Sequence, residues 1–176
     1  MRIIGIDPGS RFTGYGIIDS QGSKHSYVAG GFIKVSGDTL VDKLGCIFRE
    51  VSGLIETFSP AEMAIEQVFV NKNVDSALKL GQARGAAICA AAQFDLPVGE
   101  YAPRDIKKSV VGSGAADKQQ IQQMMKMLLK LDTLPQSDMA DALAIAMTHA
   151  HQRHSKIPTT TAKTSRRRSN KRWTSL

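Results

Sequence analysis

The chain has 176 residues, of which 42% are hydrophobic, and it carries a formal net charge of +7. This length is enough for one domain with a substantial core. No apolar run is long enough to cross a bilayer, and two cysteines, Cys46 and Cys89, are too few for a disulfide framework or a zinc site. We therefore expect a reduced, cytoplasmic protein with no membrane contact, in which both cysteines are small core residues.

The positive charge is concentrated at the C-terminus. Residues 151–176 contain eight Lys or Arg and no acid, whereas residues 1–150 contain 15 basic and 16 acidic residues. Within the body, residues 72–130 still carry nine basic residues against five acids. Such a basic stretch fits a polyanionic partner. The sequence predicts one folded domain over residues 1–152 and a basic, disordered tail over residues 153–176.

Apolar periodicity, with Gly and Pro at the boundaries, predicts the elements in chain order. Five strands are expected, at residues 2–7, 13–19, 27–35, 62–69 and 97–102. Helices are expected at residues 39–58, 76–94, 103–132 (one or two, interrupted at 111–114) and 137–151. Short loops make the first three strands an antiparallel meander, and a helical crossover makes the fifth strand parallel to the fourth. The predicted class is α/β, a five-stranded mixed sheet sandwiched between helices.

Four acidic residues stand out because of their places in these elements. Asp7 ends the first strand and Glu66 lies in the fourth, while Asp138 and Asp141 share one face of the last helix. If the first and fourth strands are neighbours, all four carboxylates meet at one edge of the sheet. Such a cluster repels itself unless it is protonated or binds cations, and its oxygen ligands suit Mg²⁺ or Mn²⁺.

Each acid also has an ordinary explanation. Asp7-Pro8-Gly9 is turn-forming sequence, and Glu66 could be solvated on an exposed strand face, as Glu62 is expected to be. Asp138 and Asp141 would each be favourable at the positive end of a helix dipole. For a single acid these explanations are at least as good as a metal site, and only the combination of all four favours metals.

Basic and aromatic residues in the second half of the chain predict a nucleic-acid groove. Each of them could instead be a solvated charge or a core side chain. The candidates for DNA contact are Phe69, Lys72, Arg84, Lys107, Lys108 and Lys118. Phe69 stands in a polar segment, where its ring can stack on an unpaired base, a contact worth roughly 1–3 kcal/mol. Lys107, Lys108 and Lys118 follow the fifth strand, where loops would border the acidic edge.

Taken together, these residues resemble the RuvC family, bacterial Holliday-junction resolvases of the RNase H-like superfamily. The resemblance covers about residues 1–150 with consistent spacing. The segment over residues 75–85 is highly specific. The motifs that carry the resemblance are Gly5-Ile6-Asp7-Pro8-Gly9-Ser10, Thr13-Gly14-Tyr15-Gly16, Ile65-Glu66-Gln67-Val68-Phe69, Asp75-Ser76-Ala77-Leu78-Lys79-Leu80-Gly81-Gln82-Ala83-Arg84-Gly85 and residues 138–146.

The resemblance implies an RNase H-like fold and a homodimer that binds four-way junction DNA and nicks two strands of like polarity symmetrically, in homologous recombination and DNA repair. It implies a site for two divalent ions, Mg²⁺ with Mn²⁺ as a substitute. Its catalytic and metal-binding acids would be Asp7, Glu66, Asp138 and Asp141. Lys107 and Lys118 fall near the family's scissile strand, and Phe69 falls on its aromatic contact near the crossover. The RuvA–RuvB branch-migration complex is the implied partner.

Two other functions compete with this interpretation. A junction-binding architectural protein without nuclease activity would explain the basic groove, but the intact acid set argues against it. A sugar kinase or ATPase with an RNase H-like fold also begins with a strand that ends in an Asp-Gly motif. Such proteins need a second phosphate loop and a longer chain, and the sequence has neither.

Overall fold

The structure, a computed structural model, describes residues 1–69 and 74–155. Its strands are β1 (Arg2–Asp7), β2 (Phe12–Gln21), β3 (Lys24–Lys34), β4 (Glu62–Glu66) and β5 (Val98–Tyr101). Its helices are α1 (Leu40–Phe58), α2 (Val74–Gln93), α3 (Pro103–Val111), α4 (Lys118–Leu128) and α5 (Ser137–Ser155). Within the described ranges, none of these helices is long and apolar enough to span a membrane.

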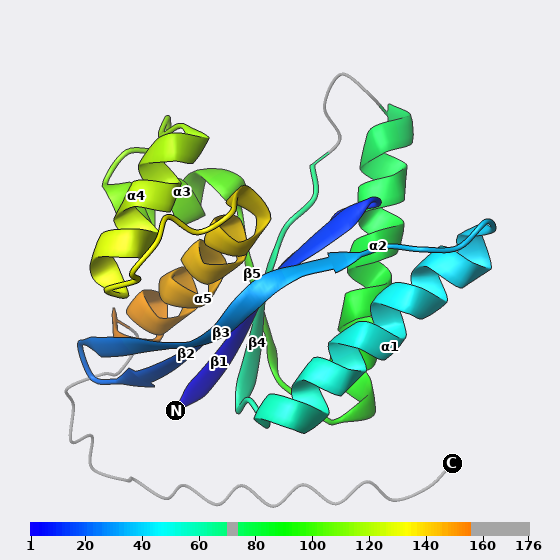
Figure 1. Cartoon of the computed structure of the whole chain (residues 1–176), viewed down its shortest axis with the longest axis horizontal. Helices are drawn as coiled ribbons and strands as arrows, with labels where there is room; N and C mark the ends of the chain where they lie inside the picture. Colours follow the sequence, from blue (N-terminus) through cyan, green and yellow to red (C-terminus); the bar gives the residue numbers. More distant parts are fainter. Residues whose placement is uncertain (70–73, 156–176) are drawn as a thin grey trace, which may run out of the picture.

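The five strands form one mixed sheet in the order β3-β2-β1-β4-β5. The first three strands pair antiparallel as a meander, and β4 and β5 continue the sheet parallel to β1. Helices α1 and α2 cover one face, and α3, α4 and α5 cover the other (Figure 1). The predicted five-stranded mixed sheet between helices is confirmed.

Side-chain alternation along β1 divides the core into two halves. Ile3 packs with α3, α4 and α5, whereas Ile4 and Ile6 pack with α1 and α2. Successive residues of a strand point to opposite faces, so a continuous apolar run such as 3–6 fits only a strand that is covered on both sides. This arrangement explains why β1 shows no polar alternation.

The element boundaries correct the sequence predictions in several places. β4 ends at Glu66, three residues earlier than expected, so Phe69 lies outside the strand. The predicted interruption within residues 103–132 is confirmed, since they form two helices separated after Gly112, which ends α3 with a φ of 81°. Cys46 is buried as predicted, but Cys89 is exposed on α2, so the prediction that both cysteines are core residues is wrong for Cys89.

Glycines on the sheet allow α5 to lie directly against the strands. A Cβ added at Gly5 would lie 2.1 Å from the carbonyl oxygen of Ala142, and one at Gly14 would lie 2.2 Å from the carbonyl oxygen of Asp138. Gly14 is also the register partner of Asp7 across β1 and β2. Because Gly14 has no side chain, the start of α5 can lie close to the end of β1.

We expect Gly14→Ala to destabilise the fold by roughly 1–3 kcal/mol, because the new methyl group collides with backbone and not with a flexible side chain. Gly53→Ala in α1 is the matched control, since a Cβ there meets nothing within 4 Å. The control should be neutral or stabilising by up to about 1 kcal/mol. Urea unfolding of both variants measures the difference, and equal stabilities would contradict the close approach of α5.

Candidate active site

Asp7 and Glu66 lie side by side at one edge of the sheet. Each is the last residue of its strand, and β1 and β4 are adjacent and parallel, with Ile6 paired with Ile65 immediately before the two acids. The carboxyl ends of adjacent parallel strands meet at the same edge, which is where α/β sheets bind ligands. The prediction that these two acids meet is confirmed.

The start of α5 brings the other two acids toward the same edge. Asp141 lines a cavity of about 340 Å³ together with Asp7 and Glu66. Asp138 does not line this cavity, although its charge acts on both Asp7 and Asp141. The cavity therefore gathers three of the four predicted acids, with Asp138 next to it.

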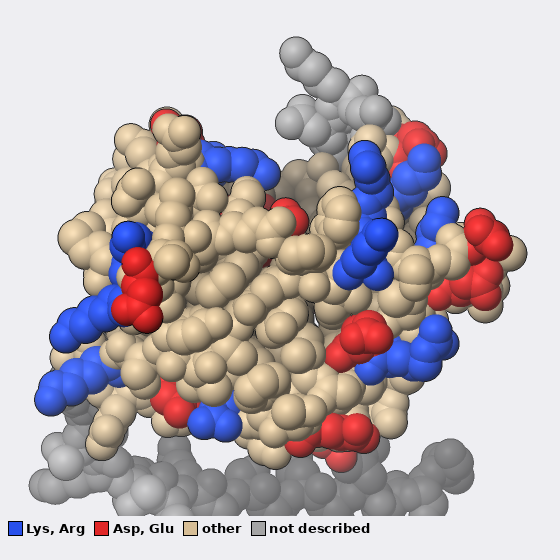
Figure 2. All heavy atoms as spheres, viewed as in Figure 1, with Lys and Arg blue, Asp and Glu red and all other residues tan. Residues whose placement is uncertain are grey.

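Lysines from the other helices complete the cavity wall. Lys107 comes from α3, and Lys118 is the first residue of α4. Lys118 Nζ lies 3.9 Å from Asp141 Oδ2, but its side chain is 75% exposed, so water screens most of this attraction. Figure 2 shows acidic atoms in the hollow between the two helical layers. The lysines thus leave the acids incompletely neutralised.

Burial and mutual repulsion raise the pKa values of three acids in the cavity, Asp7, Glu66 and Asp141. Burial is the main cause that raises the pKa of Asp7 to about 8, followed by repulsion from Glu66, Asp141 and Asp138. Burial also raises the pKa of Glu66 to about 7, while Lys107 and a hydrogen bond with Asp7 act in the opposite direction. The pKa of Asp141 is raised mainly by burial. Near neutral pH the cluster favours any cation that can replace its protons.

The donor set fits a hard divalent cation by its chemistry. Carboxylate oxygens are the ligands that Mg²⁺ and Mn²⁺ prefer, and the pKa values of Asp7 and Glu66 stay raised although Lys107 and Lys118 act to lower them. As the side chains stand, however, the described residues contain no group of three or more His, Cys, Asp or Glu positioned to hold one metal ion. Binding would therefore need the carboxylates to turn toward a common centre.

Comparison with known proteins identifies the family. Residues 3–149 match the family described as crossover junction endodeoxyribonuclease RuvC. This chain belongs to the RuvC family. The RuvC of Tolumonas auensis is 57% identical over 155 residues, which cover 88% of this chain and 90% of the relative. The RuvC of Hahella chejuensis is 51% identical over 167 residues, which cover 95% and 97%.

Solved RuvC structures share the fold. The structure of T. thermophilus RuvC in complex with Holliday junction substrate superimposes with a TM-score of 0.82 at 34% identity, covering 88% of this chain and 96% of that one. The predicted RNase H-like α/β fold is thus confirmed. The yeast mitochondrial Holliday junction resolvase Ydc2, at 16% identity and a TM-score of 0.59, shows only the same fold.

The six residues predicted to contact DNA differ in their position relative to the acidic cavity. Lys107 and Lys118 line the acidic cavity, and Phe69 lies three residues beyond Glu66 with 59% of its surface exposed. Lys108 is exposed on α3 but is not part of the cavity wall. Lys72 lies outside the described residues. The structure thus brings two of the six candidates into the cavity and leaves Phe69 open beside the end of β4.

Arg84 is engaged within the protein. Its Nε donates a hydrogen bond to the carbonyl oxygen of Glu66 at 3.1 Å, and its terminal nitrogen lies 2.5 Å from Glu100 Oε2. Only 21% of the Arg84 side chain is exposed. These contacts leave little of the guanidinium for a phosphate, in contrast to the exposed Lys118.

Two acids have roles that the sequence interpretation missed. Asp117 also lines the cavity, and its carboxylate caps α4 by accepting a hydrogen bond from the Gln120 backbone. The spacing of Asp117 and Gln120 is a capping-box signal that could have revealed this cap. Glu62, expected to be solvated, is instead largely buried and lies 2.5 Å from Nε2 of His149 on α5.

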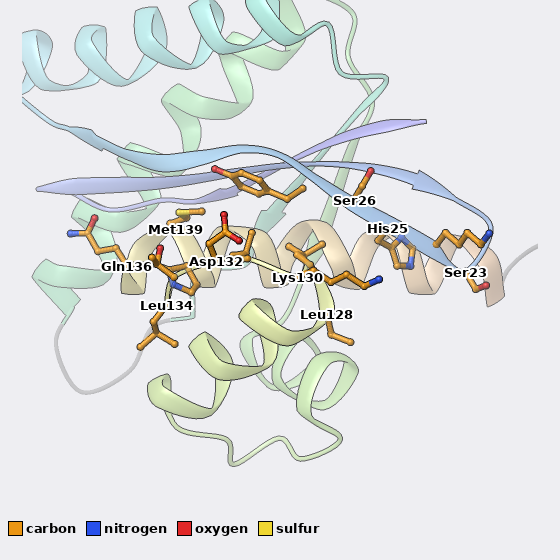
Figure 3. Close-up of a pocket in the computed structure, with 15 residues that line it drawn as sticks. Ser23, His25, Ser26, Leu128, Lys130, Asp132, Leu134, Gln136 and Met139 are labelled. Carbon is orange, nitrogen blue, oxygen red and sulfur yellow. The ribbon is translucent and has the colours of Figure 1, made fainter.

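A larger hollow among the described residues lies elsewhere. A groove of about 1060 Å³ runs between the hairpin end of β2 and β3 and the segment that joins α4 to α5 (Figure 3). His25, Lys130 and Asp132 are among its lining residues, and none of the four predicted catalytic acids is. Because β2 runs antiparallel to β1, this hairpin is at the opposite end of the sheet from Asp7. Size alone would therefore not select the cavity that contains Asp7, Glu66 and Asp141.

Proposed function

We propose that this chain is a Mg²⁺-dependent endonuclease that resolves four-way DNA junctions by nicking two strands of like polarity at symmetric positions. The observation that carries the proposal is the cavity in which Asp7, Glu66 and Asp141 meet beside Lys107 and Lys118. Family membership supplies the reaction class, since the relatives are crossover junction endodeoxyribonucleases. A Holliday junction is the substrate in the solved complex of T. thermophilus RuvC, which supports the same substrate for this chain.

The proposed chemistry is hydrolysis of a phosphodiester. Asp7, Glu66 and Asp141, with Asp138 beside them, would hold two Mg²⁺ ions, which Mn²⁺ can replace. When bound, such ions activate water and stabilise charge on the scissile phosphate. The carboxylates release their protons as they bind, because a protonated oxygen is a poor ligand. The products would carry 5′-phosphate and 3′-hydroxyl ends, which a ligase can join.

The two lysines have a separate task in this mechanism. Negative charge grows on the phosphate oxygens during hydrolysis, and a cation at the cavity wall lowers the energy of that state. Lys107 on α3 and Lys118 on α4 both line the cavity that contains the acids. Phe69 is free to stack on a base that is unpaired near the crossover.

A strand-labelled synthetic four-way junction tests the proposal. With Mg²⁺ we expect paired nicks at symmetric positions and products that a ligase can seal, whereas a linear duplex of the same sequence should remain intact. Stable binding without nicks at any Mg²⁺ or Mn²⁺ concentration would contradict the nuclease and favour the architectural alternative. Cutting of the linear duplex at a similar rate would contradict selectivity for junctions.

The proposed homodimer is supported by an open stripe on α2. The opposite face of α2 is buried through Ala83, Ala87, Ala90 and Ala91. The open stripe consists of residues that recur at helical spacing: the exposed Val74, Leu78, Gly81 and Cys89, and the half-buried Gly85. A Cβ at Gly81 or Gly85 would meet nothing within 4 Å, so a second helix could approach closely there. A two-fold dimer matches a two-fold junction and explains paired cuts.

Gly81→Arg is expected to convert the dimer to a monomer, because a long charged side chain blocks close approach at the stripe. Sedimentation equilibrium measures the association. Gly53→Arg on α1 is the control, since a Cβ at that position also meets nothing within 4 Å. The control should leave the dimer intact, and a dimer that survives Gly81→Arg would place the interface elsewhere.

Other parts of the proposal rest on the family alone. Cooperation with the RuvA–RuvB branch-migration complex and a cytoplasmic location belong to this group. The division into a nuclease domain over residues 1–152 and a basic tail over residues 153–176 also stays a proposal. Helix α5 reaches Ser155, three residues beyond that boundary, and residues 156–176 lie outside the described part of the chain.

A further inference from the structure

Arg84 connects three elements at the edge of the active site. It projects from α2, donates from Nε to the carbonyl oxygen of Glu66 on β4 at 3.1 Å, and pairs at 2.5 Å with Glu100 on β5. The guanidinium is planar and presents its donors in a rigid fork, so two contacts to different strands fix its position. Arg84 therefore joins α2 to the end of the strand that carries Glu66.

The carbonyl of Glu66 needs a donor from outside the sheet. Glu66 is the last residue of β4, and the next strand contact is the hydrogen bond from the Gln67 N–H to the Tyr101 carbonyl on β5. On the other side, β1 ends at Asp7 and continues into Pro8, which has no N–H. Arg84 therefore supplies the hydrogen-bond donor for the Glu66 carbonyl that the neighbouring strand cannot supply.

From this geometry we propose that Arg84 is a positioning residue that fixes Glu66 for metal binding, and that it is not a DNA contact. The proposal rests on the proposed function and replaces the role that the sequence predicted for Arg84. A metal site tolerates displacements of its ligands of only about 0.5 Å. Because Arg84 holds the backbone of Glu66 itself, its loss would let this ligand shift without the loss of a direct contact to the DNA.

Arg84→Ala, Arg84→Lys and Glu100→Gln test the proposal, with Lys79→Ala as the matched control on an exposed turn of α2. Arg84→Ala should lower the cleavage rate at saturating junction about 10–100-fold, since a 1 Å misplacement costs about that much. Arg84→Lys should not restore it, because the shorter lysine lacks the planar fork of donors with which Arg84 reaches both acceptors. Glu100→Gln should show a smaller loss, and the control should match the wild type.

Two further measurements separate positioning from DNA contact and from general damage. Junction affinity without metal, and its salt dependence, should be unchanged in Arg84→Ala, while the DNA-free protein should need several-fold more Mn²⁺ for half-saturation. Urea unfolding reports how far each variant is destabilised. Weaker junction binding with a salt slope reduced by about 1, restored by Arg84→Lys, would overturn the proposal and make Arg84 a phosphate contact.

Failure of this inference is distinguishable from failure of the proposed function. If the wild type nicks junctions and Arg84→Ala nicks them equally fast, the positioning role is wrong and the nuclease stands. If the wild type does not nick junctions, the nuclease proposal fails. The Mn²⁺ titration of the DNA-free protein then still shows whether Arg84 positions Glu66 for metal binding. Equal Mn²⁺ affinities of the wild type and Arg84→Ala would then reject positioning.

Discussion

Asp7→Asn is expected to lower cleavage of a four-way junction by roughly 10²–10³-fold or more while junction binding survives or tightens. Asparagine keeps the shape of the side chain but removes its charge, so the cavity loses a ligand for the cation. Above about pH 8, where Asp7 is ionised, the same change also removes one source of repulsion toward the scissile phosphate. Glu66→Gln should behave in the same way.

The measurement combines gel-shift titrations without metal and single-turnover cleavage with Mg²⁺. Asp95→Asn is the matched control, because Asp95 is an exposed acid in the turn after α2 with a φ of 50°, a conformation that asparagine adopts readily. The control should bind and cut as the wild type does. Cleavage by Asp7→Asn within a few-fold of the wild type would remove Asp7 from the metal site.

The sequence predicted the strands because they depend on local pattern, and it predicted the meeting of the acids only on the condition that the first and fourth strands are neighbours. The apolar run of β1 is buried on both faces. Because β1 is paired with a strand on each side, it ends at Pro8, which has no N–H to donate to the sheet. Once β1 and β4 are parallel neighbours, the position of Asp7 beside Glu66 follows. The glycines of β1 and β2 that allow α5 to pack closely give no such signal. The sequence around a glycine in a strand does not show whether a helix packs against it.

Contacts between distant segments explain what the sequence could not predict. Arg84 was expected to face DNA, since nothing local to α2 indicates a carbonyl 18 residues earlier in the chain. Glu62 was expected to face water, but His149 lies 87 residues later and meets it only because α5 crosses the sheet. Cys89 has the small neighbours of a core residue, yet it lies on the open stripe of α2. In each case tertiary packing decides the environment.

The stability of the metal-free protein should fall as pH rises from about 4 to about 8. Asp7 has an ordinary pKa of 3.8 and a folded-state pKa of about 8, and the pKa of Glu66 rises from 4.5 to about 7. Between these values the folded state binds more protons than the unfolded state, so each rise in pH favours unfolding. The loss should be on the order of a few kcal/mol, or several degrees in Tm.

Thermal unfolding across this pH range, with and without Mg²⁺, checks the expectation. Mg²⁺ should raise the Tm of the wild type most at pH 8, where the carboxylates can release their protons to it. Asp7→Asn should flatten the pH dependence and make the metal-free protein more stable than the wild type at pH 8, because it removes the charge that is most costly to bury. A wild-type Tm that does not change over this range would mean that the acids are already neutralised within the protein, and the cavity would then have no electrostatic reason to bind a metal ion.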